Sequence, residues 1–290
     1  MFVEIRRYDD VTAFAELAEP LLHADPVRHT IAVTVLAAQL RPSAPADLVT
    51  MLTAHGNGAL LGAAMQSRGW SLITSALPPV AVPAVVDLLQ GTPQAPPGAT
   101  GPRENAEAFV AAWCDRTGAT ARVTMAQRLF ALAELCPPRG VPGAPRVAGM
   151  DDVALLAKWR HDFAVAAMPA GWPGTEDLEA TTARQVAAGS GNLLWEVGGE
   201  PVAVALATAP VAGMSRIAGV WTPPEHRGRG FGSAATAAAS RWALEAGAEH
   251  VVLFTDLANP VTNSIYPKIG YRPLYDAVDL AFDERNVTSR

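Results

Sequence analysis

The stretch from Arg216 to Gly232 constrains the fold of this chain more than any other part of its sequence. The apolar run Arg216–Thr222 predicts a strand, Pro-Pro-Glu-His and then Arg-Gly-Arg-Gly-Phe-Gly follow it, and an alanine-rich helix is predicted to begin near Ser233. Glycines let the backbone come close to a ligand, and unpaired N–H groups at a helix start point at an anion. The two arginines add charged donors. This order of strand, loop and helix therefore predicts a phosphate site in an α/β domain.

The loop differs from two better-known phosphate-binding loops. A Walker A loop needs Gly-Lys-Ser/Thr, and this loop has no lysine. A dinucleotide-binding loop needs Gly-x-Gly-x-x-Gly, and counting from Gly228 places Ser233 where the third glycine belongs. The pattern that remains is Arg-x-x-Gly-x-Gly, from Arg227 to Gly232. It resembles the pyrophosphate loop of the GNAT N-acetyltransferase superfamily.

A second segment carries the same resemblance independently. The apolar, β-branched run His250–Thr255 predicts a buried parallel strand. Asn259 is a good N-cap, Pro260 suits the first helical position, and a short helix to about Ile269 is closed by Gly270. A strand, Asn-Pro, a short helix and Ile-Gly-Tyr form a layout similar to the one that follows the cofactor helix in GNAT proteins. The resemblance therefore covers residues 145–290.

The resemblance implies the α/β fold class, with a mixed β-sheet of the α+β kind. The chain is expected to divide into three parts. The proline-rich stretch 136–145 breaks all periodicity and predicts a linker. A GNAT acetyltransferase domain is expected at 146–290. We expect a degenerate GNAT-like domain at 1–135, so that two such domains stand in tandem, each a central mixed β-sheet flanked by helices.

The N-terminal part repeats the plan of the C-terminal part more weakly. Where the second half has Arg-x-x-Gly-x-Gly, we place Gly101-Pro102-Arg103-Glu104 in the first half. This segment has no glycine pair, and Glu104 is expected near the place where phosphate would bind. The hypothesis is a domain that has lost cofactor binding, and the alternative is an unrelated α/β domain.

Composition and charge exclude several classes of function. The formal net charge of −6 argues against a nucleic-acid surface, and with the missing lysine it disfavours a nucleotide or RNA binder. No apolar run reaches the about 20 residues of a membrane span, and no signal peptide is visible, so a cytoplasmic protein is expected. The six histidines show no metal-ligand spacing, and the two cysteines, Cys114 and Cys136, are expected to be reduced. No metal site is predicted.

The resemblance implies acetyl-CoA as the cosubstrate and assigns it two contact regions. Backbone N–H groups of the loop would hold the pyrophosphate, and Arg229 is either a further contact or a solvated surface residue. In the family the preceding strand splays away from its neighbour, so its backbone would pair with the pantetheine arm and the N–H of Val220 would face the thioester oxygen. The side chain of Val220 can pack in the core at the same time. These cofactor residues are Val220, Trp221, Thr222, Arg227, Gly228, Arg229, Gly230, Phe231, Gly232 and Ser233.

Three residues around the short helix complete the expected cofactor site. Tyr266 stands where many GNAT enzymes carry a tyrosine, and it is expected to be the general acid that protonates the departing thiolate; a structural tyrosine is the alternative. A phenol with a pKa near ~10 can supply a proton to a thiolate with a pKa near ~8.5. Asn259 is expected to cap the helix and to bind the pantetheine arm, or to cap it alone. Asn263 is expected to reach the cofactor.

The acceptor side is less well defined by the sequence. The candidates for the general base are Glu225, Glu196 and His226. Each of them is expected to lie on a solvated face instead. Trp172 and Trp221 are expected to line an acceptor pocket or to plug the core, and Glu196 on a hairpin strand is a third candidate substrate residue. The acceptor would be a small-molecule or peptide amine.

The sequence therefore predicts an acetyl-CoA-dependent N-acetyltransferase that moves an acetyl group directly to a primary amine. The alternative is a non-catalytic acyl-CoA binding or sensing protein with the same fold. The resemblance does not fix the acyl length, and either a monomer or a homodimer is compatible with it. The N-terminal half is expected to be a structural partner.

Overall fold

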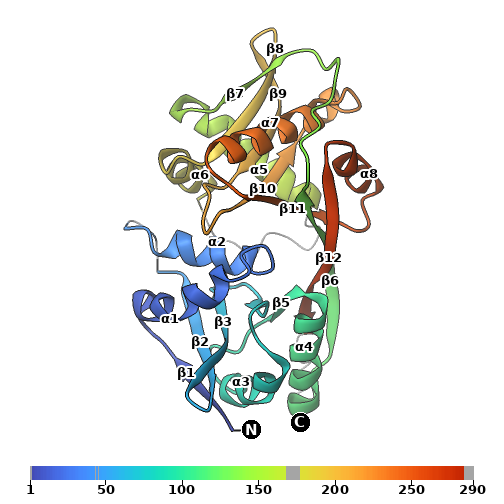
Figure 1. The fold of residues 1–290 in the computed structure, drawn as a ribbon. Coiled ribbons are helices and arrows are strands. Elements are labelled where there is room, and N and C mark those ends of the chain that lie inside the picture. The colour runs from blue at the N-terminus through green and yellow to red at the C-terminus, as the bar shows by residue number, and fades with distance from the viewer. Residues whose placement is uncertain (1, 43, 45, 168–176, 284–290) are drawn as a thin grey trace. The chain divides into compact units, whose positions relative to one another are not determined.

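The computed structural model describes residues 2–42, 44, 46–167 and 177–283, which form two compact units (Figure 1). One unit comprises the described residues up to Gln127 together with those from Asp276 onward, and the other is Arg128–Tyr275. The chain passes between the units inside two long strands, β6 (Ala121–Leu132) and β12 (Tyr271–Phe282). Each unit is a mixed α/β structure, as the sequence predicts.

The C-terminal unit follows the predicted order β-α-α-β-β-β-α-β-α-β, which ends in β12. The connection from β10 to α7 contains a 3₁₀ turn, Pro224–His226. The other elements of the C-terminal unit are β7 (Ala144–Val147), α5 (Val153–Ala167), α6 (Leu178–Ala187), β8 (Gly191–Val197), β9 (Glu200–Ala207), β10 (Met214–Trp221), α7 (Phe231–Glu245), β11 (His250–Asp256) and α8 (Pro260–Lys268).

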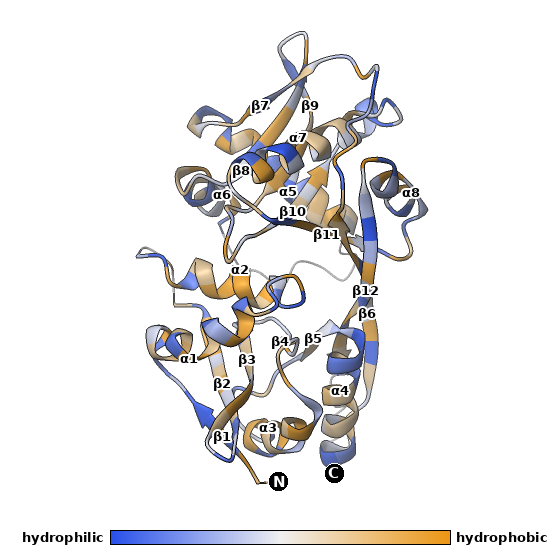
Figure 2. Cartoon of the chain, in the orientation of Figure 1, coloured by the Kyte–Doolittle hydropathy of each residue, from blue (hydrophilic) through white to orange (hydrophobic). Residues whose placement is uncertain are grey.

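The strands of this unit form a mixed sheet with a helical layer on each face. Antiparallel pairs join β7, β8, β9 and β10 in that order, and β11 is parallel to β10. Alternate residues of β9 point to the two faces of the sheet. Ala205 packs in the core beneath α7, and Val204 packs with Trp159 of α5 on the other face. The alanines of α7 let that helix lie close to the sheet, and Ala235 and Ala239 have no exposed surface. Hydrophobic residues accordingly follow the strands and the inward faces of the helices (Figure 2).

The N-terminal unit has the same order of elements. They are β1 (Val3–Arg7), α1 (Val11–His23), α2 (Thr30–Gln39), β2 (Leu48–Gly56), β3 (Ala59–Ser67), β4 (Leu72–Ile73), α3 (Val82–Leu89), β5 (Gly98–Pro102), α4 (Arg103–Thr117) and the start of β6. A parallel pair joins β4 and β5, as a parallel pair joins β10 and β11. The repeat that the sequence suggests weakly is therefore present element by element.

This order corrects the predicted position of the N-terminal counterpart of the glycine-rich loop. Gly101–Glu104 joins β5 to α4, whereas the glycine-rich loop joins β10 to α7. The counterpart by topology is Thr74–Ala81, between β4 and α3. Both connections carry Pro-Pro at the start of a 3₁₀ turn, which begins at Pro79 in one unit and at Pro224 in the other. In the N-terminal unit α3 begins directly after the turn, without an Arg-Gly-Arg-Gly insertion.

The boundaries of the two compact units differ from the predicted domain boundaries at 135 and 146. The whole proline-rich stretch 136–145 belongs to the C-terminal unit, where Trp195 Nε1 donates a hydrogen bond to the carbonyl of Pro142 at 2.8 Å. Conversely, the end of β12 pairs with β5 in the N-terminal unit, from Ala277 opposite Pro102 onward. Proline and glycine content indicated a linker, but these residues pack against their own unit.

Candidate functional site

The glycine-rich loop forms a compact turn between β10 and α7. Arg227 Nε donates a hydrogen bond to the carbonyl of Thr222 at 3.0 Å, which closes the loop on itself. Gly228 and Gly230 have φ angles of +76° and +82°, a region that other residues enter at a cost. A Cβ on Gly232 would lie 3.1 Å from Thr222 Oγ1, so glycine there allows the helix start to approach the strand end closely.

The first turn of α7 presents backbone donors without a side-chain cap. Gly230 occupies the N-cap position and has no side chain to cap with, and the N–H of Ala234 is the one that donates to the Gly230 carbonyl, at 3.0 Å. Geometry therefore leaves the N–H groups of Phe231, Gly232 and Ser233 without an intrahelical acceptor. Phe231 is 1% exposed and fixes the start of the helix in the core. A helix start of this kind suits an anion.

Two arginines flank this helix start, and both are exposed. The guanidinium of Arg227 lies 4.9 Å from the centre of the Trp221 ring, and that of Arg229 lies 4.8 Å from the centre of the Phe231 ring. Each cation is thus held over an aromatic face, with its remaining donors directed to solvent. All the predicted loop residues are brought together here.

Strands β10 and β11 separate immediately before the loop. Their parallel pairing runs from Met214 opposite His250 to Ile217 opposite Leu253, while β10 continues to Trp221. A β-bulge on β10 between Ala218 and Trp221 shifts its register with β9, and Gly219 in the bulge has a φ of +55°. The backbone beyond Ile217 is therefore free of strand pairing on its β11 side. The predicted splaying of this strand is confirmed.

The side chains at the end of β10 alternate between the two cores. Val220 packs against the core beneath α7, in agreement with its expected packing, and Trp221 packs against the core beneath α5 and α6. The indole Nε1 of Trp221 is buried and has no hydrogen-bond partner among the described residues. Trp221 thus offers an unused donor on the α5 side of the sheet.

Tyr266 lies on α8 and is 5% exposed. Its ring centre is 6.1 Å from that of Tyr271, whose hydroxyl lies 2.6 Å from Ser240 Oγ. Burial raises the pKa of Tyr266 to about 12, so the phenol carries its proton at neutral pH. The hydroxyl itself makes no hydrogen bond within the part of the chain that the structure describes. Tyr266 is thus a core residue whose hydroxyl is protonated at neutral pH.

The two asparagines hold the connection between β11 and α8. Asn259 Oδ1 accepts from the N–H groups of Val261 and Thr262 at 3.1 and 3.2 Å, which confirms its capping role. Asn263 Nδ2 donates to the carbonyls of Asp256 and Asn259, at 2.9 and 2.8 Å. Asn263 Oδ1 accepts from the hydroxyl of Thr255 at 2.6 Å. Asn263 is thus engaged within its own unit, and the predicted contact of either asparagine with a cofactor stays a prediction.

The candidate acceptor residues are not brought together by the described structure. Glu196 forms an ion pair with Arg146 at 2.8 Å on the β7–β8 edge, and Trp172 lies outside the described residues. Glu225 is exposed, as expected. His226 is partly buried with its Nδ1 enclosed and its ring 6.5 Å from that of Phe231, so the expectation that it faces solvent is wrong.

Arg216 is a polar residue in this region that sequence analysis missed. It stands one residue before the end of the β10–β11 pairing, and its Nε is buried without a partner among the described residues. A charged residue inside an otherwise apolar strand was the available signal.

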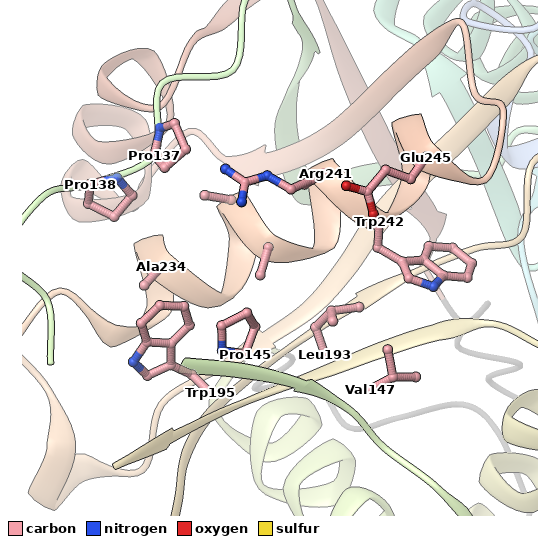
Figure 3. A pocket seen from close by; sticks show the side chains of 12 residues that line it. Pro137, Pro138, Pro145, Val147, Leu193, Trp195, Ala234, Arg241, Trp242 and Glu245 are labelled. Carbon is pink, nitrogen blue, oxygen red and sulfur yellow. The ribbon is translucent and has the colours of Figure 1, made fainter. Parts of the chain in front are cut away.

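A separate cavity lies between α7 and the strands β7 and β8 (Figure 3). It has a volume of about 290 Å³ and is lined mainly by apolar groups of α7, β7, β8 and the proline-rich stretch, with Arg241 and Glu245 at its rim. None of the predicted site residues lines it. Among the described residues, no helix is both long and apolar enough to cross a membrane.

Comparison with known proteins shows which protein family residues 153–271 match. A model of the acetyltransferase (GNAT) family matches residues 153–271, and no curated protein sequence matches the chain. The fold is similar to that of a GNAT-family acetyltransferase from Colwellia psychrerythraea, with a TM-score of 0.64 at 12% identity over 97% of this chain and 100% of that one. It is also similar to a GCN5-related N-acetyltransferase from Kribbella flavida, with a TM-score of 0.58 at 21% identity over 79% of this chain and 90% of that one.

A third similar structure has two domains as well. It is described as a tandem GNAT protein from the clavulanic acid biosynthesis pathway, and the TM-score is 0.61 at 13% identity over 98% of both chains. The chain accordingly has a GNAT fold in tandem. Residues 153–271, which contain the glycine-rich loop and Tyr266, form a domain of the GNAT acetyltransferase family.

Proposed function

We propose that the C-terminal unit binds acetyl-CoA and transfers its acetyl group directly to the primary amine of a small molecule or peptide. The observation that carries the proposal is the meeting of two features at one loop. The opening between β10 and β11 begins after Ile217, and the bare N-terminus of α7 begins at Phe231. An extended arm ending in a diphosphate requires both features: strand-like backbone for the arm and helix donors for the diphosphate.

The loop residues fit the cofactor in charge and in space. The pyrophosphate would lie against backbone N–H groups between Arg227 and Ser233, where Gly228 and Gly232 leave room for it. The pantetheine arm would pair with the unpaired backbone of β10 beyond Ile217, including that of Val220, Trp221 and Thr222. In Phe231, Gly232 and Ser233 this assignment uses N–H groups that have no intrahelical acceptor.

The chemistry needs a nucleophile, a polarised carbonyl and a proton donor. The amine nitrogen attacks the thioester carbon, the C–S bond breaks, and the nitrogen gives up a proton. The N–H of Val220 would stabilise the oxygen of the tetrahedral intermediate, and Tyr266 would protonate the leaving thiolate. The Tyr266 phenol is protonated at physiological pH, and its pKa of about 12 makes it a weaker acid than an exposed tyrosine. We assign no general base.

We propose further that the N-terminal unit does not bind acetyl-CoA. Its corresponding connection contains Pro78 and Pro79 and runs directly into α3, whose second residue is Pro83. Prolines have no N–H, and the N–H of Val82 is already bonded to the carbonyl of Pro79. The donors that α7 offers are thus missing or used at the start of α3. A cytoplasmic location and a monomer or homodimer belong to the same proposal.

The experiment that tests catalysis is thiol release from acetyl-CoA in the presence of a panel of primary amines, with Tyr266→Phe as the diagnostic variant. If the proposal holds, the wild type releases CoA with at least one amine, and Tyr266→Phe binds acetyl-CoA normally but turns over about 10²-fold or more slowly. Binding without turnover in the wild type would favour the alternative, a non-catalytic acyl-CoA binding or sensing protein. Unchanged turnover in Tyr266→Phe would remove Tyr266 from the mechanism.

A further inference from the structure

Arg216 is a partly buried cation on the central strand of the C-terminal unit. Its neighbour Ile217 packs in the core beneath α7, so strand alternation places Arg216 on the opposite face, which α5 and α6 cover. Its Nε is enclosed and has no hydrogen-bond partner among the described residues. Burial lowers the pKa of the guanidinium to about 10.

No carboxylate of the described protein compensates this charge. On α5, Asp162 pairs with Lys158 at 2.7 Å, and before α5 Asp152 pairs with Arg146 at 2.7 Å. Before α6, Asp177 accepts from the N–H groups of the first helical turn. Each carboxylate around this face therefore has another partner or, like Glu179, is exposed. A guanidinium that is partly buried and has no counter-ion among the described residues is costly, because part of its hydration is lost.

Two further polar atoms on the same face lack partners among the described residues. Trp221 Nε1 is one, and the Trp221 side chain packs against the α5–α6 core together with Val186 of α6. Thr182 Oγ1 is the other; Thr182 precedes Val186 by one helical turn and is 1% exposed, so it lies on the same side of α6. Arginine and tryptophan side chains donate hydrogen bonds and accept none, and a threonine hydroxyl can also donate. The face is thus rich in unused donors and poor in acceptors.

We infer that Arg216 binds a carboxylate of the acceptor, so that the acceptor is a small amine that also carries a carboxylate group. This inference rests on the proposed function, because it defines the substrate class of the same site. A carboxylate accepts hydrogen bonds only and supplies the negative charge that the guanidinium lacks. It would pair with the guanidinium of Arg216 when the acceptor binds.

The position of Arg216 suits this role. It stands at the closed end of the opening between β10 and β11, and Val220, the expected site of the thioester, is four residues further along the strand, about 13 Å away. A carboxylate held by the long side chain of Arg216 would leave the amine of the same molecule directed along the strand toward the thioester. A lysine side chain within a folded protein carries no carboxylate of its own beside its amine.

The first test measures carboxylate binding without catalysis. The melting temperature of the protein is compared in sodium formate and in sodium chloride at equal ionic strength. Formate should raise the Tm of the wild type by about 3 °C once its free concentration exceeds the dissociation constant about tenfold. Arg216→Met should abolish this rise and should itself melt higher than the wild type in chloride, because a partly buried charge without a described counter-ion is gone. Arg241→Met removes an exposed guanidinium of the same unit and should leave the formate effect unchanged.

An equal formate effect in Arg216→Met, or no formate effect in the wild type, would overturn the inference. If Arg216→Met does not fold, Arg216→Gln replaces it as a neutral variant that keeps a donor. Binding of acetyl-CoA, measured in the same preparations, reports on the proposed function separately. A protein that binds acetyl-CoA but ignores formate contradicts the carboxylate site alone.

The second test uses matched acceptors that differ by the carboxylate. L-lysine is compared with cadaverine, and L-phenylalanine with phenethylamine, as acetyl acceptors of the wild type. The carboxylated member of a pair should be favoured in kcat/KM by about tenfold or more, as expected for one lost charged hydrogen bond. The preference should disappear in Arg216→Met. Equal use of both members, or a preference that survives in Arg216→Met, would contradict the inference.

Discussion

Arg227 Nε donates a hydrogen bond to the carbonyl oxygen of Thr222 at 3.0 Å, and the guanidinium lies over the ring of Trp221. One side chain thus joins the end of β10 to the turn that leads into α7. The strand that would hold the pantetheine arm and the loop that would hold the pyrophosphate are therefore fixed relative to each other. Arg229 has a contact with Phe231 alone among the interactions found in the described structure.

The two loop arginines should consequently differ in their effect on acetyl-CoA binding. Arg227→Ala removes both a charged donor and the bond that shapes the loop, so its Kd should rise about tenfold or more. Arg229→Ala removes an exposed charge, so its Kd should rise about threefold, and the effect should shrink at high salt. Isothermal titration at two salt concentrations measures both. A larger effect of Arg229→Ala would contradict the assigned roles.

The bulge on β10 should be sensitive to a single methyl group. Gly219 has a positive φ, and a Cβ there would lie 2.7 Å from Leu206 Cδ1. Gly219→Ala should therefore lower the free energy of unfolding by about 3 kcal/mol, from backbone strain and overpacking together. The matched control is Gly199→Ala, where φ is also positive but no atom lies within 4 Å, and about 1 kcal/mol is expected. Urea unfolding measures both, and equal losses would argue against a tightly packed bulge.

The asparagines of the β11–α8 connection should contribute unequally to stability. Asn263→Ala removes bonds to three carbonyls and leaves the buried Thr255 hydroxyl without its acceptor, so a loss of about 3 kcal/mol is expected. Asn259→Ala removes a helix cap and should cost about 1 kcal/mol. Chemical denaturation of the two variants gives the comparison, and a greater loss for Asn259→Ala would contradict the observed bonding.

Tyr266 should make the protein less stable at high pH. Its folded pKa of about 12 exceeds the value near ~10 of an unfolded tyrosine, so the folded state holds the proton longer. The stability is fully present below pH ~10 and is lost as the pH rises toward ~12, by about 1 kcal/mol per pH unit. Tyr266→Phe should lose less stability than the wild type between pH ~10 and ~11. Identical pH profiles of the unfolding free energy in the two proteins would show that Tyr266 is not buried in solution.

Much of the site could be predicted from local sequence. The loop at Arg227–Gly232 and the cap at Asn259 depend on residues next to one another, and such patterns have local physical causes. Strand β2 was missed even though Asn57-Gly58 gave a hairpin signal, and both residues have positive φ angles in the turn that follows it. The predicted counterpart loop at Gly101–Glu104 lies one helix and one strand further along the chain than Thr74–Ala81, the counterpart by topology.

Other features depend on partners that are distant in sequence. Strand β5 is Gly-Ala-Thr-Gly-Pro, which has little β-propensity, and it forms because it pairs with β12. Gly98 is required there because a Cβ would lie 1.8 Å from the carbonyl oxygen of Leu280. That Arg216 has no carboxylate partner among the described residues is also a tertiary property, since it depends on where the fold places residues that are distant in sequence. Local patterns cannot contain this information.

The most direct test of the central claim is calorimetric titration of the protein with acetyl-CoA, using Gly228→Glu and Gly199→Glu as matched variants. Both glycines have positive φ angles and open space, but only Gly228 belongs to the loop. The account predicts one acetyl-CoA per chain in the wild type, an unchanged Kd in Gly199→Glu, and loss of binding in Gly228→Glu through charge and bulk. Two molecules bound per chain would contradict a silent N-terminal unit. No binding in the wild type, or full binding in Gly228→Glu, would contradict the assignment of the cofactor site itself.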